Sequence, residues 1–187
     1  MAGLWELENK IKNCKNCPLS LTRKNAVPGE GREDANIIFI GEAPGKSEDE
    51  TGKPFVGKAG NFLDFALTGI GLKREDIYIT NVVKCRPPGN RDPREEEIKA
   101  CIPYLDGQIS IIKPKIFCTL GKFATTYILS SYGFDSEPIS RVHGRVYSSP
   151  VAMIKIIPMY HPAATIYNPA LKEYFLRDMG VIKKLLD

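Results

Sequence analysis

A short apolar run that ends in a glycine-rich loop constrains the fold of this chain more than any other feature. Residues 37–40 (IIFI) are all apolar, without polar residues between them, which is typical of a strand covered on both faces in a parallel sheet. The run ends at Gly41, and a long polar loop with several glycines leads to Gly60. Because ligands in open α/β sheets bind beyond the carboxyl ends of the strands, we first expect a functional site in this loop.

Three more segments, residues 77–83, 115–120 and 151–158, have the apolar and β-branched character of strands. We expect helices between and around them, over residues 4–13, 60–72 and 93–112, after Gly121 and after Asn168. This alternation predicts an α/β fold, a three-layer α/β/α architecture with a central, mostly parallel sheet of about four strands. A length of 187 residues suits a single domain over residues 1–187.

The charge balance is mildly basic, with 26 Lys and Arg residues against 22 Asp and Glu residues and a net charge of +4. This balance permits a polyanionic partner without requiring one. No stretch of about 18 apolar residues is present to span a membrane. The first residues, MAGLWELENKIKNCKNC, are too charged for a signal peptide. We therefore expect a cytoplasmic protein with no membrane partner.

The five cysteines favour a metal site over a disulfide framework, because their number is odd and the expected compartment is reducing. Cys14 and Cys17 form a CxxC pair, Cys85 follows the second strand, and Cys101 lies on the next helix. Four such thiolates can surround one zinc ion or hold a [4Fe-4S] cluster, and the spacing does not choose between them. The alternative is a set of scattered buried thiols. Cys118, inside an apolar strand, is expected to be a core residue.

The loop sequence GEAPGKS, residues 41–47, looks like a phosphate-binding motif but fails its spacing. A Walker A motif has four residues between its glycines, and this loop has three. Pro44 also lacks the backbone N–H that would contact phosphate. The sequence therefore disfavours a nucleotide triphosphatase.

Several polar and aromatic residues near strand ends fit a pocket for a flat ligand. Glu42 and Glu48 could activate water, and Phe55 could stack on a ring. Asn81, among apolar neighbours in the second strand, could both donate to and accept from a pyrimidine edge. His161 follows the fourth strand. Each has a structural alternative, such as a solvated acid, a core anchor or an amide that satisfies local backbone groups.

Together these motifs resemble the family 4 uracil-DNA glycosylases, which are iron–sulfur enzymes. The resemblance rests on GEAPG, GKPFVGKAG, TNVVKCRPPGNRDP, the cysteine set and a late HPAA turn, and it covers the chain from Cys14 to the last helix. It implies a DNA repair enzyme that flips uracil out of DNA and hydrolyses its N-glycosidic bond, which leaves an abasic site. The alternative function is a non-catalytic, metal-stapled nucleic-acid-binding module.

The resemblance implies a [4Fe-4S] cluster with four ligands: Cys14, Cys17, Cys85 and Cys101. It implies uracil-containing DNA as the partner, with a sliding clamp or another repair protein as a further candidate, and a monomeric enzyme. Basic residues near the loops are candidate phosphate contacts: Lys53, Lys58, Arg86, Arg91 and Arg94. The other histidine, His143, is expected to have a surface role. Ile166 or Tyr167 is the expected wedge that enters the base stack.

The resemblance also implies a substrate-binding set: Glu42, Ala43, Glu48, Phe55, Asn81 and His161. Phe55 would stack on the flipped uracil, Asn81 would read its edge, and Glu48 would crowd the C5 position, where thymine carries a methyl group. His161 would stabilise negative charge at O2. In better-known uracil glycosylases an Asp in the first motif positions water, but Ala43 stands at that place here. Glu42 is therefore the expected water-orienting residue, and the expected catalytic pair is His161 and Glu42.

Overall fold

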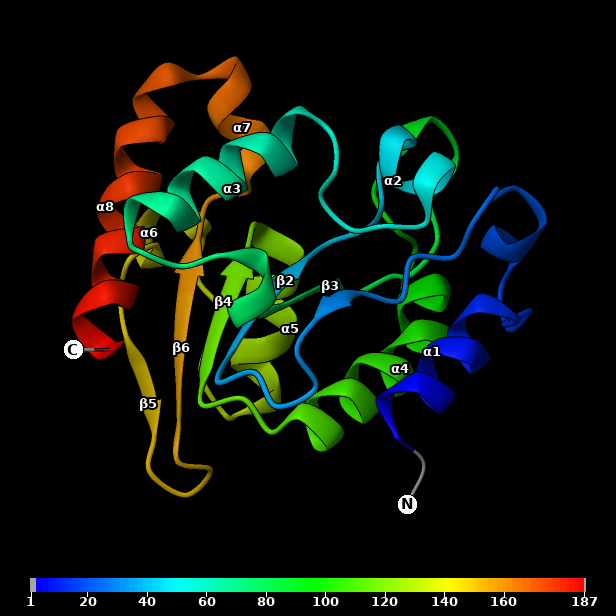
Figure 1. Cartoon of the computed structure of the whole chain (residues 1–187), viewed down its shortest axis with the longest axis horizontal. Coiled ribbons are helices and arrows are strands. Elements are labelled where there is room, and N and C mark those ends of the chain that lie inside the picture. The colour runs from blue at the N-terminus through cyan, green and yellow to red at the C-terminus, as the bar shows by residue number, and fades with distance from the viewer. Residues whose placement is uncertain (1–2, 187) are drawn as a thin grey trace.

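The computed structural model describes residues 3–186, and these form a six-stranded sheet between two layers of helices (Figure 1). The strands, in chain order, are β1 (Glu30–Gly31), β2 (Ile37–Gly41), β3 (Tyr78–Asn81), β4 (Ile116–Leu120), β5 (Tyr147–Ser149) and β6 (Ile154–Met159). Their order across the sheet is β1-β3-β2-β4-β6-β5. The four inner strands are parallel to one another, and the short β1 and β5 pair antiparallel at the two edges. The expected parallel sheet of about four strands is thus the centre of a six-stranded mixed sheet.

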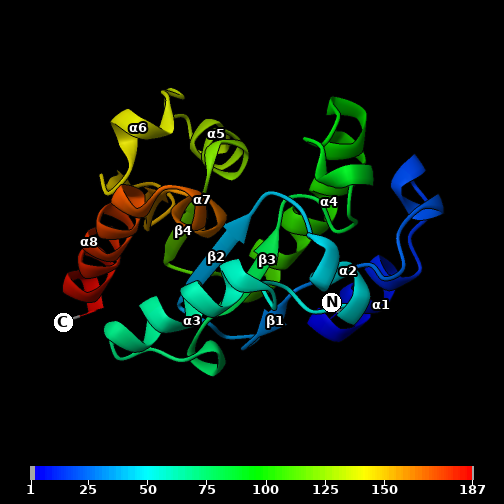
Figure 2. The same ribbon diagram turned by 90° about the horizontal axis from the view of Figure 1, so that it is seen from above.

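The helices cover both faces of this sheet, as the view from above shows (Figure 2). The α-helices are α1 (Leu4–Lys12), α2 (Lys46–Thr51), α3 (Lys58–Gly69), α4 (Glu95–Ile112), α5 (Lys122–Ser131), α6 (Ile139–Val142), α7 (Pro162–Tyr167) and α8 (Pro169–Leu186). Three short 3-10 turns are η1 (Pro18–Leu21), η2 (Arg74–Asp76) and η3 (Pro88–Asn90).

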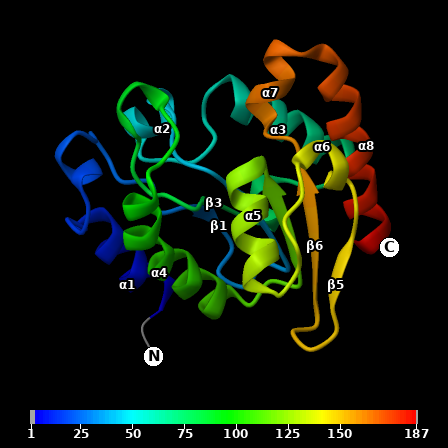
Figure 3. The ribbon, with the colours of Figure 1, turned by 180° about the vertical axis from the view of Figure 1, so that it is seen from behind.

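Two hydrophobic clusters join these layers. On one face, buried residues of α1, α4 and α5 pack on the sheet, and the view from behind shows these helices in front of it (Figure 3). On the other face, residues of α3 and α8 do so. The expected three-layer α/β/α arrangement is therefore confirmed. Cys118 of β4 is fully buried, as expected of a core residue.

Three boundaries and the number of strands differ from the sequence-based expectation. The strand expected over 77–83 ends at Asn81, because the next N–H groups, of Val82 and Val83, turn to the carbonyls of Gly41 and Glu42 (2.9 Å each). The strand expected from residue 151 begins at residue 154, after a turn. The helix expected from Pro93 begins at Glu95. The sheet also has two edge strands beyond the four expected, β1 and β5, and β5 pairs antiparallel with β6.

The late start of α4 has a local cause. The carboxylate of Glu97 accepts a hydrogen bond from the backbone N–H of Arg94 (2.8 Å), which makes Arg94 the N-cap, one residue after the expected first helical residue Pro93. Glu97 is only 1% exposed and also receives two hydrogen bonds from Arg91 (2.9 and 2.6 Å). The expected start at Pro93 was wrong because the sequence pattern does not show this buried ion pair.

The glycine-rich loop after β2 is not a loop throughout, because it contains α2. The helix begins after Gly45, where the side chain of Glu48 accepts from the backbone N–H of Gly45 (3.0 Å). It ends at Gly52, whose φ of 73° is the left-handed conformation that glycine adopts easily. A turn-rich composition concealed this short helix.

Candidate active site

All six residues expected to bind the substrate line one cavity of about 370 Å³ at the carboxyl ends of the parallel strands: Glu42, Ala43, Glu48, Phe55, Asn81 and His161. Glu42 and Ala43 follow β2, Asn81 ends β3, and His161 comes two residues after β6. Parallel strands deliver these ends to the same edge of the sheet, as Figure 1 shows for β2, β4 and β6. The structure thus brings the whole predicted set together.

Asn81 is the most informative side chain of the cavity. It is 1% exposed, and its Oδ1 is the one buried side-chain polar atom without a hydrogen-bond partner among residues 3–186. Leaving such an acceptor unsatisfied is costly, so an isolated instance indicates a site for a ligand donor. In the β2–β3 ladder, Asn81 is directly beside Gly41.

Gly41 creates the space in which Asn81 and Phe55 approach each other. A Cβ on Gly41 would overlap both Oδ1 of Asn81 and the edge of the Phe55 ring. The sequence-based reasoning treated Gly41 only as the end of a strand and missed this role. The combination of a strand-end glycine with a polar residue in the neighbouring strand is a signal that only the pairing of β2 with β3 makes visible.

Phe55 and His161 form a stacked pair on one side of the cavity. Their ring centroids are 5.6 Å apart, with an interplanar angle of 28°. Phe55 is 5% exposed, so most of its ring is packed in the core and only a small part borders the cavity. The core-anchor alternative and the ligand-stacking role are therefore compatible for this residue.

His161 is a neutral imidazole with a defined tautomer. Its Nδ1 accepts a hydrogen bond from the backbone N–H of Ala163 (3.1 Å) at the start of α7, which leaves the proton on Nε2. Burial lowers the pKa of His161 to about 4, with a smaller opposing effect of Glu48. At neutral pH the ring is therefore an uncharged hydrogen-bond donor.

The carboxyl group of Glu42 has a pKa close to neutrality. Burial, followed by the nearby negative charge of Asp92, raises the pKa of Glu42 to about 7. A carboxylate whose pKa is close to neutral can accept a proton from water more readily than an ordinary one. Asp92 belongs to the same cavity wall and was not among the predicted site residues.

The carboxylate of Glu48 is fixed by backbone N–H groups of the surrounding loop. One carboxylate oxygen accepts from the N–H groups of Val56 (2.9 Å) and Gly57 (3.1 Å), and the other accepts from Gly45 (3.0 Å). These bonds connect the start of α2 to the segment after Phe55. Its predicted position near C5 of the base stays a prediction, and the structure adds this organising role.

The four predicted ligand cysteines lie close enough to affect one another electrostatically. The pKa of the Cys85 thiol is raised, first by burial, and Cys14 and Cys17 contribute to that rise. Burial likewise raises the pKa of Cys101 to about 11, with contributions from Cys85 and Cys17. In the part of the chain that the structure describes, no three or more His, Cys, Asp or Glu side chains have the arrangement of a closed metal site.

Hydrogen-bond donors already point at three of these sulfurs. Nη1 of Arg23 donates to Sγ of Cys85 (2.9 Å), and the backbone N–H of Lys84 donates to Sγ of Cys101 (3.2 Å). The N–H of Asn16 donates to Sγ of Cys14 (3.4 Å). Donors of this kind stabilise thiolates and are typical neighbours of cluster ligands. The four cysteines, with the N–H donors beside three of them, therefore fit a metal centre bound by thiolates.

The chain is similar to known proteins over most of its length. Residues 28–180 match the family model of the uracil DNA glycosylase superfamily. The chain belongs to the uracil-DNA glycosylase superfamily. It is 49% identical to a type-4 uracil-DNA glycosylase of Sulfurisphaera tokodaii, over 99% of this chain and 86% of that protein. It is 48% identical to one of Saccharolobus solfataricus, over 100% of this chain and 88% of the relative.

The chain is also similar to a more distant relative. A type-5 uracil-DNA glycosylase of Thermus thermophilus is 29% identical over 85% of this chain and 80% of that protein. The higher identity to type-4 proteins agrees with the resemblance drawn from the motifs.

One buried residue that supports the superfamily pocket was missed in the sequence. Lys84 is 1% exposed, and its Nζ donates to the carbonyl of Asn81 (2.6 Å), to Thr80 Oγ1 (2.6 Å) and to Gln108 Oε1 (2.7 Å). It therefore ties the end of β3 to α4. A lysine at the end of an apolar strand looks solvent-exposed in sequence, and only the position of α4 reveals its burial.

Some predicted peripheral residues have other partners. Arg91 is bound to Glu97, and Lys53 pairs with Glu30 (3.7 Å). His143, expected to have a surface role, is mostly buried instead: its ring packs against Tyr160 and Tyr174, and its Nδ1 lies 2.9 Å from Oδ2 of the buried Asp178. Tyr167 is 88% exposed and Ile166 43% exposed, so both wedge candidates are accessible.

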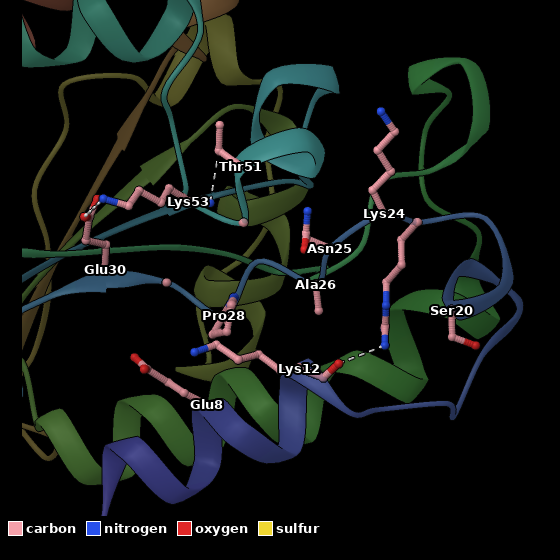
Figure 4. Close-up of a pocket in the computed structure, with 13 residues that line it drawn as sticks. Glu8, Lys12, Ser20, Lys24, Asn25, Ala26, Pro28, Glu30, Thr51 and Lys53 are labelled. Carbon is pink, nitrogen blue, oxygen red and sulfur yellow. Dashed lines mark hydrogen bonds and ion pairs between the residues drawn. The ribbon is translucent and has the colours of Figure 1, made fainter.

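A second cavity, of about 640 Å³, lies between α1 and the end of α2 and contains none of the residues expected to bind the base; of the candidate phosphate contacts, Lys53 lines it (Figure 4). Positively charged lysines and negatively charged glutamates both line this cavity, and Lys53 forms an ion pair with Glu30 (Figure 4). It contains the amide of Asn25 but lacks the aromatic side chains of the smaller cavity. Among residues 3–186, no helix has the length and apolar character needed to cross a bilayer.

Proposed function

We propose that this protein is a DNA repair enzyme that flips uracil out of DNA and hydrolyses its N-glycosidic bond. The observation that carries this proposal is the unpartnered Oδ1 of Asn81, next to the stacked rings of Phe55 and His161 in one cavity. A flipped pyrimidine needs an edge reader and a stacking surface, and this cavity provides both. The type-4 relatives carry the name of that activity.

Recognition of uracil depends on Asn81. Its Oδ1 accepts from N3–H of the base, and its amide N–H donates to O4. The ring of Phe55 stacks on the base. Glu48, fixed by three backbone N–H groups, limits the space beside C5, so that the methyl group of thymine does not fit.

Cleavage breaks the bond between C1′ of the sugar and N1 of uracil. The electron pair of that bond leaves with the base, and the negative charge spreads to O2, where Nε2–H of His161 donates a hydrogen bond. Water adds its hydroxyl to the oxocarbenium-like C1′, and Glu42 takes the proton that the water releases. The products are uracil and an abasic site. A preorganised neutral donor needs no proton transfer at the moment of cleavage.

The cysteines Cys14, Cys17, Cys85 and Cys101 hold a [4Fe-4S] cluster in this proposal. Four protein ligands leave no open coordination position, so the cluster has a structural role. It connects the segment after α1 to the loop that precedes α4, and Pro87, Asn90 and Asp92 of that loop line the base cavity. The cluster therefore supports one wall of the site.

The remaining features of the proposal concern the cellular setting. The enzyme acts as a monomer on uracil-containing DNA in the cytoplasm, where reducing conditions preserve the thiolates.

Lys58, Arg86 and Arg94 contact phosphates on either side of the flipped base, and Tyr167 or Ile166 fills the vacated place in the stack. A sliding clamp or another repair protein is a further partner.

Release of free uracil from DNA tests the proposal. Purified protein is incubated with single-stranded and duplex DNA that contain one uracil, and with the same strands that contain thymine instead. We expect uracil and an abasic site from the uracil-containing DNA and no product from the thymine control. Binding of uracil-containing DNA without release would instead support the non-catalytic nucleic-acid-binding module.

A further inference from the structure

The backbone of Phe55 has an unusual conformation for an aromatic residue. Its φ is 50°, in the left-handed region that residues with a side chain rarely adopt. Such a conformation persists only where the surrounding structure enforces it, and it occurs preferentially in functional sites. Because Phe55 borders the base cavity, the groups that enforce this conformation also set the position of the stacking ring.

Two glycines accommodate Phe55 from opposite sides. Gly60, in the first turn of α3, lies so close that a Cβ there would overlap the carbonyl of Phe55. Gly41 leaves room for the edge of the Phe55 ring. These contacts permit the conformation but do not bind the backbone of Phe55.

Arg74 holds the backbone of Phe55 through hydrogen bonds. Its Nη2 donates to the carbonyl of Phe55, and its Nη1 donates to the carbonyl of Pro54 (2.9 Å). The same guanidinium is oriented by Nε, which donates to Oδ1 of Asp64 on α3 (2.6 Å), and by Nη1, which lies 3.3 Å from Oε2 of Glu30. All three guanidinium nitrogens are therefore engaged, and the side chain is 24% exposed.

Arg74 does not itself line the base cavity. It lies in η2, before β3, about twenty residues from Phe55 in the sequence, and it reaches Phe55 only through the backbone. A planar guanidinium can bond two successive carbonyls and an acid at once, whereas a lysine ammonium is a single point charge on a flexible stem. The contact geometry therefore requires Arg rather than any cation.

We propose that Arg74 is a positioning residue that holds Phe55 in its left-handed conformation and so places the ring for stacking on the flipped base. This inference rests on the proposed uracil-excising function. Arg74 has no contact with the base or the reacting atoms. Arg74 is not among the candidate phosphate contacts and does not line the base cavity, so we expect its effect to be on how well the pocket accepts a base.

The test compares the variant Arg74→Lys with wild type in two binding measurements. One is inhibition of cleavage by free uracil, which needs the stacking ring. The other is affinity for a duplex that carries a tetrahydrofuran abasic site, which has no base to stack. We expect Arg74→Lys to weaken inhibition by uracil and to lower kcat/KM by about 100-fold, as for a misplaced binding group, with unchanged affinity for the abasic duplex.

Two more variants separate the role of the carbonyl bonds from that of the charge. Glu30→Gln removes an ion-pair partner of Arg74 but leaves both carbonyl bonds, so it should behave like wild type. Gly60→Ala places a Cβ against the same carbonyl, so it should reproduce the pattern of Arg74→Lys. Assays are run well below the melting temperature of each variant, so that loss of folded protein does not enter the comparison.

The inference is overturned if Arg74→Lys retains wild-type cleavage and inhibition by uracil, or if it loses affinity for the abasic duplex as much as for uracil. Failure of the proposed function would give a different result, because the wild-type protein itself would then release no uracil.

Discussion

The backbone N–H of Ala163 donates a hydrogen bond to Nδ1 of His161 over 3.1 Å. This bond makes His161 the cap of α7 and fixes the tautomer that carries its proton on Nε2. The alternative tautomer would lose the cap and place a lone pair, rather than a donor, at Nε2. A strand end, a helix start and a hydrogen-bond donor are thus combined in one residue.

Replacing His161 with Ala should slow uracil release by about 100-fold or more, the usual effect of losing one donor to a developing anion. Binding of DNA that contains an uncleavable uracil analogue should change little, because the hydrogen bond strengthens only as charge develops at O2. Single-turnover rates and equilibrium titrations measure the two effects. Equal losses in rate and affinity would contradict the role of His161 in transition-state stabilisation.

The pH dependence of cleavage should report Glu42. Since its pKa is raised to about 7, the ionised base is lost as the pH falls through this value, and the rate should fall with it. His161, with its pKa lowered to about 4, stays neutral in this range and does not cause the decline. Glu42→Gln should lower the single-turnover rate by about 100-fold and remove this pH dependence.

Glu50→Gln is a matched control for Glu42, because Glu50 is exposed and lies outside the base cavity. It should retain both the rate and the acid limb of the wild-type profile. If Glu42→Gln kept an acid limb near pH 7, another group would have to be the base.

Gly41→Ala should disrupt the pocket through sterics alone. The added Cβ would displace Asn81 Oδ1 and the ring of Phe55 together, so cleavage should fall by about 100-fold or more. The melting temperature should also fall, because both side chains are packed in a buried region. Gly69→Ala, where a Cβ would meet nothing within 4 Å, is the control and should leave both measurements near wild type.

The cysteine set can be tested by iron content. Anaerobically purified wild-type protein should be brown, with broad visible absorption and about four irons per chain, as a [4Fe-4S] cluster requires. Cys101→Ser should lower the iron content and the melting temperature. Cys118→Ala removes a cysteine that is buried in β4 outside the set, so it should keep the full iron content. A colourless wild-type protein that contains zinc would contradict the cluster assignment.

The sequence predicted the layered fold because hydrophobic periodicity depends on local residue order. The runs at residues 37–40, 77–83 and 115–120 became strands β2, β3 and β4, and helices α3 and α4 formed between them. Local patterns did not predict the start of α4 or the existence of α2. Both depend on glutamates, Glu97 and Glu48, whose side chains bond to backbone N–H groups in ways that composition does not reveal.

The sequence alone determined which chemical groups stand beyond the strand ends, and with them the pocket set that includes Glu42, Asn81 and His161. Only the tertiary structure decided the states of these groups, because hydrogen bonding and burial arise between segments far apart in the chain. It made Asn81 Oδ1 an unpartnered acceptor, raised the pKa of Glu42 and fixed the tautomer of His161. It also brought Arg74 to the carbonyl of Phe55, a contact that no spacing in the sequence predicts.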